Sequence, residues 1–277
     1  MGFPPTNTPN TTATNPINQP PLCHCASSTL YLRPLSNPVH AAITPLPPDL
    51  LAARPPTILV FGGTFDPPHL GHVQLPLAVR NGIDTNAWLL YIPAARSPHK
   101  GPGPHARPAQ RMEMLALALT GVPHAALWTD EIDRAAGFDT PSYTVDTLAR
   151  LRHALDNAGL GQTSLRLLIG ADQALSFHRW RDPRGVIELA EPAVLCRGAL
   201  AQPEHIASAL ARFDFWTPGE LQAWRTRLLQ APPIDASSTT LRSALAAEDF
   251  HTAGRFLHPG VLAYIRTHNL YHPGTGP

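Results

Sequence analysis

The stretch that decides the fold is TILVFGGTFDPPHLGH, residues 57–72. Its first five residues form a continuous apolar run, which is typical of a strand buried on both faces of a parallel sheet. Gly62 and Gly63 end this run, and the residues from Leu70 to Asn81 are expected to form a helix. Strand, tight turn and helix together predict the start of a βαβ unit.

The same alternation continues beyond this stretch and predicts an open parallel sheet. The segment from Arg96 to Pro108 is rich in proline and glycine and is expected to be a loop, and Thr140-Pro141 is expected to cap the last long helix. After residue 200 we expect short helices and no further strands. The predicted fold class is α/β: a Rossmann-like open parallel sheet with helices on both faces and a small helical C-terminal portion. Further strands are expected at Ala87–Ile92, Ala125–Trp128, Leu165–Ile169 and Ala193–Cys196, and further helices at Ala109–Thr120 and up to Ala158.

Composition excludes several classes of protein. The chain has 277 residues, with 21 basic and 20 acidic side chains and a formal net charge of +1. This balance gives no electrostatic argument for a nucleic acid or an anionic membrane as partner. No apolar run approaches the ~18 residues that span a bilayer. Three cysteines cannot form a disulfide framework, so we expect a cytoplasmic protein.

The first 53 residues differ from the rest of the chain. They are rich in proline and almost free of charge, and they show no periodic apolar pattern. We therefore expect a poorly ordered extension over residues 1–53 and one folded domain over residues 54–277. Cys23-His24-Cys25 offers too few well-spaced ligands to predict a metal site.

The turn after the first strand is suited to binding an anion. Gly62 and Gly63 let backbone N–H groups approach a phosphate, and His69 and His72 share one face at a helix start, where the dipole favours negative charge. Gly71 is expected to keep that face open. The alternatives are a plain strand-to-helix turn with solvated histidines, or zinc binding, although no third ligand with metal spacing lies nearby.

A second block, DASSTTLR at residues 235–242, has the same character. Three or more hydroxyl residues open a helix, and Arg242 follows Ser238 by one turn, so hydroxyls, N–H groups and a guanidinium converge. No acidic residue enters until Glu248. A helix-capping turn without a ligand is the alternative.

These two blocks resemble the signatures of the HxGH nucleotidylyltransferase superfamily, and the GGTFDP form is similar to that of bacterial nicotinate-nucleotide adenylyltransferases. The second block resembles the family's ISSTxIR motif, with Ala236 in place of isoleucine. The resemblance extends over about residues 57–271, and the region between Arg197 and Ile234 matches poorly. Four further segments are similar to family motifs: Ser97-Pro98-His99-Lys100, Arg111 with Met114-Leu115, Pro141-Ser142-Tyr143-Thr144 and Ile169-Gly170-Ala171-Asp172.

The resemblance implies a reaction in which ATP and nicotinate mononucleotide give nicotinate adenine dinucleotide and pyrophosphate, with Mg²⁺ accompanying ATP and held mostly by substrate oxygens and water. The phosphate oxygen of the mononucleotide attacks directly, so the enzyme positions substrates and neutralises charge. It implies catalytic roles for His69, His72, Lys100 and Arg242. It implies ATP binding by Gly62, Gly63, Thr64, Phe65, Gly71, Gly170, Asp172, Ser237, Ser238 and Thr239, and mononucleotide binding by Tyr143 and Trp180.

Two other functions stay open at this stage. A related transferase could adenylylate nicotinamide mononucleotide or phosphopantetheine instead. A non-catalytic nucleotide-binding protein on the same fold would be expected to lack one of the histidines, Lys100 or Arg242, and all are present.

Overall fold

The computed structural model describes residues 42–95, 104–135, 142–196, 202–230 and 234–272, together with Gly2 and Pro232. Lys100, the Cys23-His24-Cys25 cluster, Pro141 and Arg197 lie outside the described residues. The fold below is that of the described part of the chain.

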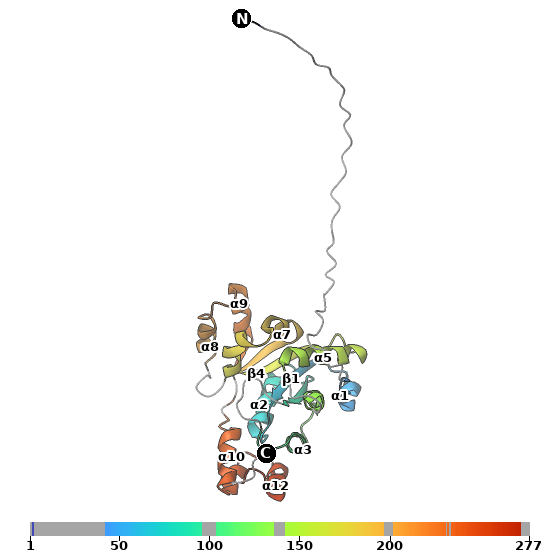
Figure 1. Cartoon of the computed structure of the whole chain (residues 1–277), viewed down its shortest axis with the longest axis vertical. Coiled ribbons are helices and arrows are strands. Elements are labelled where there is room, and N and C mark those ends of the chain that lie inside the picture. The colour runs from blue at the N-terminus through green and yellow to red at the C-terminus, as the bar shows by residue number, and fades with distance from the viewer. Residues whose placement is uncertain are drawn as a thin grey trace. The chain divides into compact units, whose positions relative to one another are not determined.

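Six parallel strands form one sheet in the order β3-β2-β1-β4-β5-β6 (Figure 1). The order reverses between β1 and β4, which are direct neighbours through the pairing of Val60 with Leu167. In such sheets ligands bind beyond the carboxyl ends of the strands at this reversal. The strands are β1 Thr57–Gly63, β2 Trp88–Pro93, β3 Ala125–Leu127, β4 Ser164–Gly170, β5 Glu191–Cys196 and β6 Leu228–Gln230.

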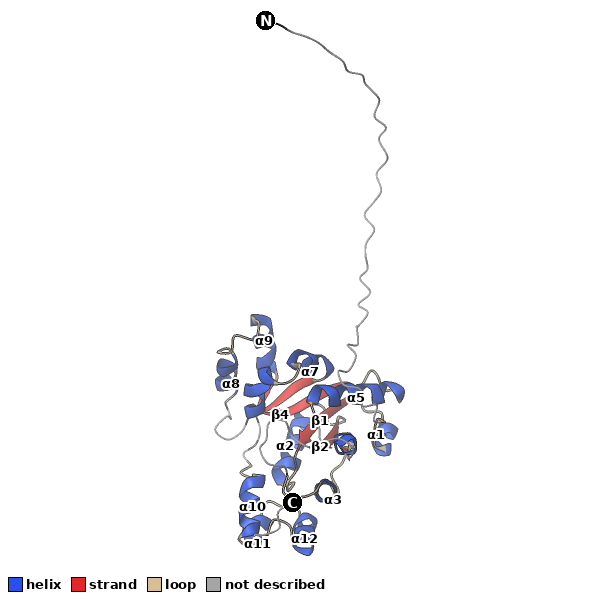
Figure 2. Ribbon diagram, in the orientation of Figure 1, coloured by secondary structure: helices blue, strands red, loops and turns tan. Residues whose placement is uncertain are grey.

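Helices cover both faces of this sheet (Figure 2). Successive residues of β1 point to opposite faces: Ile58 packs with Leu151 of α5, whereas Leu59 packs with Leu75 of α2. The helices are α1 Pro48–Ala53, α2 Leu70–Ile83, α3 Pro108–Ala118, α4 Asp130–Ala135, α5 Thr144–Asn157, α6 Ala171–Ser176, the 3₁₀ helix η1 Phe177–Arg179, α7 Pro183–Leu189, α8 Pro203–Leu210, α9 Pro218–Thr226, α10 Ser238–Ala246, α11 Phe250–Gly254 and α12 Pro259–Thr267.

The last three helices form a separate apolar cluster with α3. Leu241, Val261 and Ile265 are almost fully buried there, against Met114 of α3. The predicted Rossmann-like sheet, with helices on both faces and a helical C-terminal portion, is therefore confirmed.

Two predicted details are wrong. A strand does occur after residue 200: β6 pairs with β5 at the sheet edge, and its three residues are too few to show a strand pattern. Helix α5 begins at Thr144 with Tyr143 as its N-cap, three residues later than the Thr140-Pro141 signal indicated.

The boundary expected at residue 53 is also wrong. Residues 48–53 form helix α1, and Leu46 and Leu50 are 6% and 0% exposed in the main core. Thr44 accepts a hydrogen bond from the indole Nε1 of Trp128 and donates its backbone N–H to Asp130. A six-residue helix is too short to produce a periodic apolar pattern, so the sequence analysis did not predict it.

Candidate active site

One large cavity, of about 580 Å³, opens at the carboxyl ends of β1 and β4. The described residues that the sequence assigned to ATP or to catalysis all line it, and so does Trp180. They are Gly62, Gly63, Thr64, Phe65, His69, Gly71, His72, Gly170, Asp172, Ser237, Ser238, Thr239 and Arg242. Blocks almost 180 residues apart in the chain therefore face one space.

The two histidines stack at the start of α2, with ring centroids 3.7 Å apart. The backbone N–H of His69 donates to Nδ1 of His72 at 3.2 Å. Since Nδ1 accepts, a neutral His72 ring carries its proton on Nε2, which makes that nitrogen a donor. No acidic residue lies in the first turn of α2, so the helix dipole also favours an anion here.

Gly71 has a different role from the one expected. A Cβ at this position would lie 3.0 Å from Cε1 and Nδ1 of the His69 ring. Glycine thus gives the His69 ring the space to lie against the helix start, rather than leaving that face open. A β-carbon would push the ring out of its stack with His72.

Asp66 connects the turn after β1 to distant parts of the chain. Its carboxylate, 3% exposed, accepts from the backbone N–H groups of His105 (2.7 Å) and Ala106 (3.1 Å) and from the hydroxyl of Tyr271 (2.8 Å). Burial and the Asp66 charge raise the pKa of Tyr271, which stays a donor. These donors occupy the Asp66 carboxylate within the protein.

The buried guanidinium of Arg111 stabilises the same turn by a hydrogen bond to its backbone. Arg111 is 0% exposed and donates from Nη1 to the carbonyl oxygen of Thr64 at 2.7 Å. Burial lowers the pKa of Arg111, and the nearby Asp66 charge opposes that effect. The cation thereby balances the buried carboxylate and fixes the backbone at Thr64.

The hydroxyl-rich block starts helix α10 and grips the turn after β1. Ser237 caps the helix by accepting from the backbone N–H of Thr240 at 3.1 Å. Ser238 donates to the carbonyl of Pro67 at 3.0 Å. Arg242 donates from Nη1 to the carbonyl of Asp66 at 2.6 Å. Ser237 thus caps the helix, and five residues of the block also line the cavity: Ala236, Ser237, Ser238, Thr239 and Arg242.

At the end of β4, Asp172 is exposed and lines the cavity. A Cβ on Gly170 would lie 2.5 Å from its carboxylate oxygen Oδ1. Gly170 therefore allows the carboxylate to lie against the strand end. An exposed carboxylate here can accept hydrogen bonds from hydroxyl groups of a ligand.

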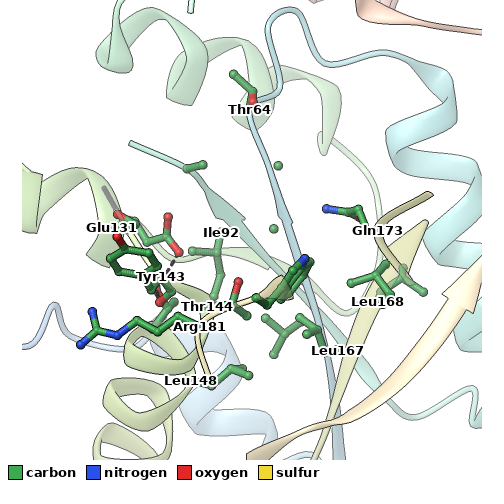
Figure 3. A pocket seen from close by; sticks show the side chains of 18 residues that line it. Thr64, Ile92, Glu131, Tyr143, Thr144, Leu148, Leu167, Leu168, Gln173 and Arg181 are labelled. Carbon is green, nitrogen blue, oxygen red and sulfur yellow. Dashed lines mark hydrogen bonds between the residues drawn. The ribbon is translucent and has the colours of Figure 1, made fainter. Parts of the chain in front are cut away.

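A smaller cavity of about 140 Å³ adjoins the large one and shares Gly63, Thr64 and Trp180 with it. In Figure 3, Tyr143 and Arg181 lie on one side of this cavity, and Leu168 and Gln173 on the other. The guanidinium of Arg181 lies over the Tyr143 ring, 4.7 Å from its centroid. The cavity brings together Tyr143 and Trp180, the two side chains predicted to bind the mononucleotide.

The start of α5 and the carboxyl group of Glu131 also line the smaller cavity. The N-cap Tyr143 makes no side-chain hydrogen bond to the first turn of α5, so the helix dipole there favours an anionic ligand, while Asp146 in that turn pairs with Arg181. Desolvation raises the pKa of Glu131, against the hydrogen bond from Thr147. This reduces the negative charge of Glu131 beside the helix end.

Sequence reasoning missed several residues around the site. Asp66 was quoted only as part of a motif, Arg111 only as a family match, and Tyr271 not at all. His105 and Gln173 line the large cavity without belonging to any predicted block. His105 lies in a proline- and glycine-rich segment, where the sequence shows no pattern that would indicate a binding residue. Lys100 lies outside the described residues, so its predicted role stays a prediction.

Comparisons with known proteins show which family this chain resembles. The family described as cytidylyltransferase-like matches residues 60–244. The probable nicotinate-nucleotide adenylyltransferase of Chromobacterium violaceum is 38% identical over 216 residues, which cover 76% of this chain and 97% of that protein. That of Halorhodospira halophila is 39% identical over 197 residues, covering 69% and 84%.

A solved structure supports the fold. The nicotinic acid mononucleotide adenylyltransferase of Plasmodium falciparum, complexed with APC, superposes with a TM-score of 0.52 at 16% identity, over 78% of this chain and 96% of that one. Within the described residues, no helix is long and apolar enough to cross a membrane. With the family match covering most of the chain and a relative of 38% identity aligned along three quarters of it, this chain belongs to the nicotinate-nucleotide adenylyltransferase family.

Proposed function

We propose that this chain transfers the adenylyl group of ATP to nicotinate mononucleotide, giving nicotinate adenine dinucleotide and pyrophosphate in NAD biosynthesis. The observation that carries the proposal is one cavity lined by both anion-binding blocks, His69 to His72 and Ser237 to Arg242, with a second, partly aromatic cavity beside it. Two adjacent cavities fit two substrates that react with each other.

In this reaction a phosphate oxygen of the mononucleotide forms a bond to the α-phosphorus of ATP, and the bond from that phosphorus to the bridging oxygen breaks, releasing pyrophosphate. The chain needs no nucleophile of its own. His69 and His72, at the helix start, are assigned to the charge that develops at the α-phosphorus, with Nε2 of His72 as a donor. Arg242, Ser238 and Thr239 are assigned to the leaving pyrophosphate.

Asp172 is assigned to the ribose of the adenosine. A carboxylate accepts from two vicinal hydroxyls without strain, and Gly170 allows it to lie at the strand end. We therefore propose that the adenosine lies near β4 and the triphosphate along the starts of α2 and α10.

The residues present fit a Mg²⁺ ion that enters with ATP. Among the described residues, no three His, Cys, Asp or Glu side chains are grouped to hold a metal, and donors from the protein already occupy the carboxylate of Asp66. Substrate oxygens and water would supply most of the ligands. When bound, the ion neutralises charge on the phosphates.

The smaller cavity supports nicotinate mononucleotide as the acceptor. Tyr143 and Trp180 offer ring surface for a pyridine. The start of α5, with no side-chain cap, offers backbone N–H groups and a positive dipole end for the nicotinate carboxylate. A neutral amide gains less from that dipole, so we propose a preference for the acid over nicotinamide mononucleotide.

The test is pyrophosphate release by the purified chain with ATP and Mg²⁺, using nicotinate mononucleotide, nicotinamide mononucleotide and phosphopantetheine in turn. We expect the highest kcat/KM with the first. Equal or higher turnover with either of the others would refute the proposed acceptor. A cytoplasmic location and the absence of a nucleic-acid partner stay predictions from composition.

A further inference from the structure

We infer that His105 is a further phosphate-binding side chain, which contacts the pyrophosphate end of the bound triphosphate. The inference rests on the proposed function for the identity of the ligand. His105 lies outside every motif of the two anion-binding blocks.

The position of His105 is fixed by Asp66. Its backbone N–H donates to Oδ2 of Asp66 at 2.7 Å, and its ring Nδ1 lies 3.4 Å from the same oxygen. The side chain is 57% exposed and lines the large cavity. The ring therefore lies with Nδ1 near the Asp66 carboxylate and is exposed over much of its surface.

The two residues that anchor the phosphate-binding block lie at the same place. Arg242 donates to the carbonyl of Asp66, and Ser238 donates to the carbonyl of the next residue, Pro67. His105, Ser238 and Arg242 therefore all contact the dipeptide Asp66-Pro67, and all three line the cavity. Ser238 and Arg242 are residues assigned above to the leaving pyrophosphate.

The chemistry of the ring suits a bridge between two anions. With Nδ1 turned to the Asp66 carboxylate, Nε2 is the nitrogen left for a ligand. To bridge them, the ring donates from Nδ1 to the Asp66 carboxylate and from Nε2 to a phosphate oxygen. One such charge-assisted hydrogen bond changes affinity by about tenfold.

A purely structural role does not account for the ring. The Asp66 carboxylate already accepts from the N–H groups of His105 and Ala106 and from the Tyr271 hydroxyl. The backbone N–H of His105 is kept in any substitution except proline. Removing the imidazole therefore leaves the buried carboxylate with its donors, and the fold should lose little.

The test compares the full chain with His105→Ala, His105→Lys and, as a matched control, His153→Ala on the exposed face of α5. Dissociation constants for ATP, ADP and AMP are measured by calorimetry, together with inhibition by pyrophosphate and the melting temperature. We expect His105→Ala to weaken the binding of ATP and pyrophosphate about tenfold and the binding of AMP less than about twofold. The melting temperature should fall by no more than about 2 °C. His105→Lys restores part of the affinity, and His153→Ala changes nothing.

Unchanged ATP and pyrophosphate affinity in His105→Ala would overturn the inference. Equal weakening of AMP and ATP would overturn the assigned position, and a large loss of melting temperature would indicate a structural role instead. Because binding is measured without an acceptor, failure of the proposed function is distinguishable: the unsubstituted chain would then bind ATP and show no turnover with nicotinate mononucleotide.

Discussion

Deleting residues 1–53 is expected to destabilise the domain severely, whereas deleting residues 1–41 is not. The difference is the segment that carries Leu46 and Leu50, which are 6% and 0% exposed. Burial of a leucine side chain contributes about 1.5–3 kcal/mol. The longer deletion also leaves Nε1 of Trp128 and Oδ1 of Asp130 without their hydrogen bonds to Thr44, at about 1–3 kcal/mol each.

The expected loss of about 5–12 kcal/mol is comparable to the whole free energy of unfolding of a typical domain. Urea unfolding followed by circular dichroism measures it in the full chain and the two deletions. We expect the 1–41 deletion to stay within about 1 kcal/mol of the full chain, and the 1–53 deletion to be insoluble or largely unfolded.

A pair of point variants separates the apolar contact from the chain length. Leu50→Ala should cost about 2–5 kcal/mol, and Asp49→Ala, on the exposed side of the same helix, less than about 1 kcal/mol. If the 1–53 deletion unfolded at the same urea concentration as the full chain, the packing argument for α1 would be refuted.

Three further predictions concern single side chains. His72→Ala should lower kcat by about 10²–10³ with a stability loss of about 1–2 kcal/mol, since the hydrogen bond from the N–H of His69 and the stack with its ring are lost; near-normal turnover would remove His72 from the site. Arg242→Lys should weaken ATP and pyrophosphate binding at least about tenfold. It should also lower stability by about 1–2 kcal/mol, because the hydrogen bond from Nη1 to the carbonyl of Asp66 is lost. Unchanged ATP kinetics would contradict the assignment. The hydrogen bond from Arg184 lowers the pKa of Glu220 to about 2. The contribution of this pair to the free energy of unfolding is therefore present above pH 4.5 and is lost as the pH falls towards 2. Glu220→Gln should flatten the pH dependence of stability in that window, and an unchanged acid limb would argue against the pair.

The elements predicted best are those whose burial is uniform. β1 and β2 lie inside a parallel sheet, so both faces select apolar residues and the apolar run in each is continuous. β6 and α1 were missed because three and six residues carry too little pattern to separate an element from a loop. The start of α5 was misplaced because a proline at a helix start is a local preference, and tertiary packing decided otherwise.

The candidate site divides in the same way. Residues in contiguous blocks, such as His69 with His72 and Ser238 with Arg242, could be predicted because their spacing alone puts them on one helix face. That the two blocks lie close together in space could be predicted only from the resemblance to a family. The contacts of Asp66 with His105 and Tyr271 could not be predicted at all, since they join positions 39 and 205 residues apart and leave no periodic trace.

The hydrogen bond from Tyr271 to Asp66 has a consequence for how the chain is made. A ribosome that adds about 5–20 residues per second needs roughly 10–40 s to go from one residue to the other. Until then, the carboxylate beside the phosphate-binding turn lacks one of its three donors, and a buried carboxylate with a donor missing favours open conformations of that turn. The nascent chain therefore completes its nucleotide site at the end of synthesis rather than when the motif itself emerges. Unfinished chains contain the residues 62–72 of the turn but lack the hydrogen bond from Tyr271 that fixes Asp66. We therefore expect them to bind ATP less well than the completed protein.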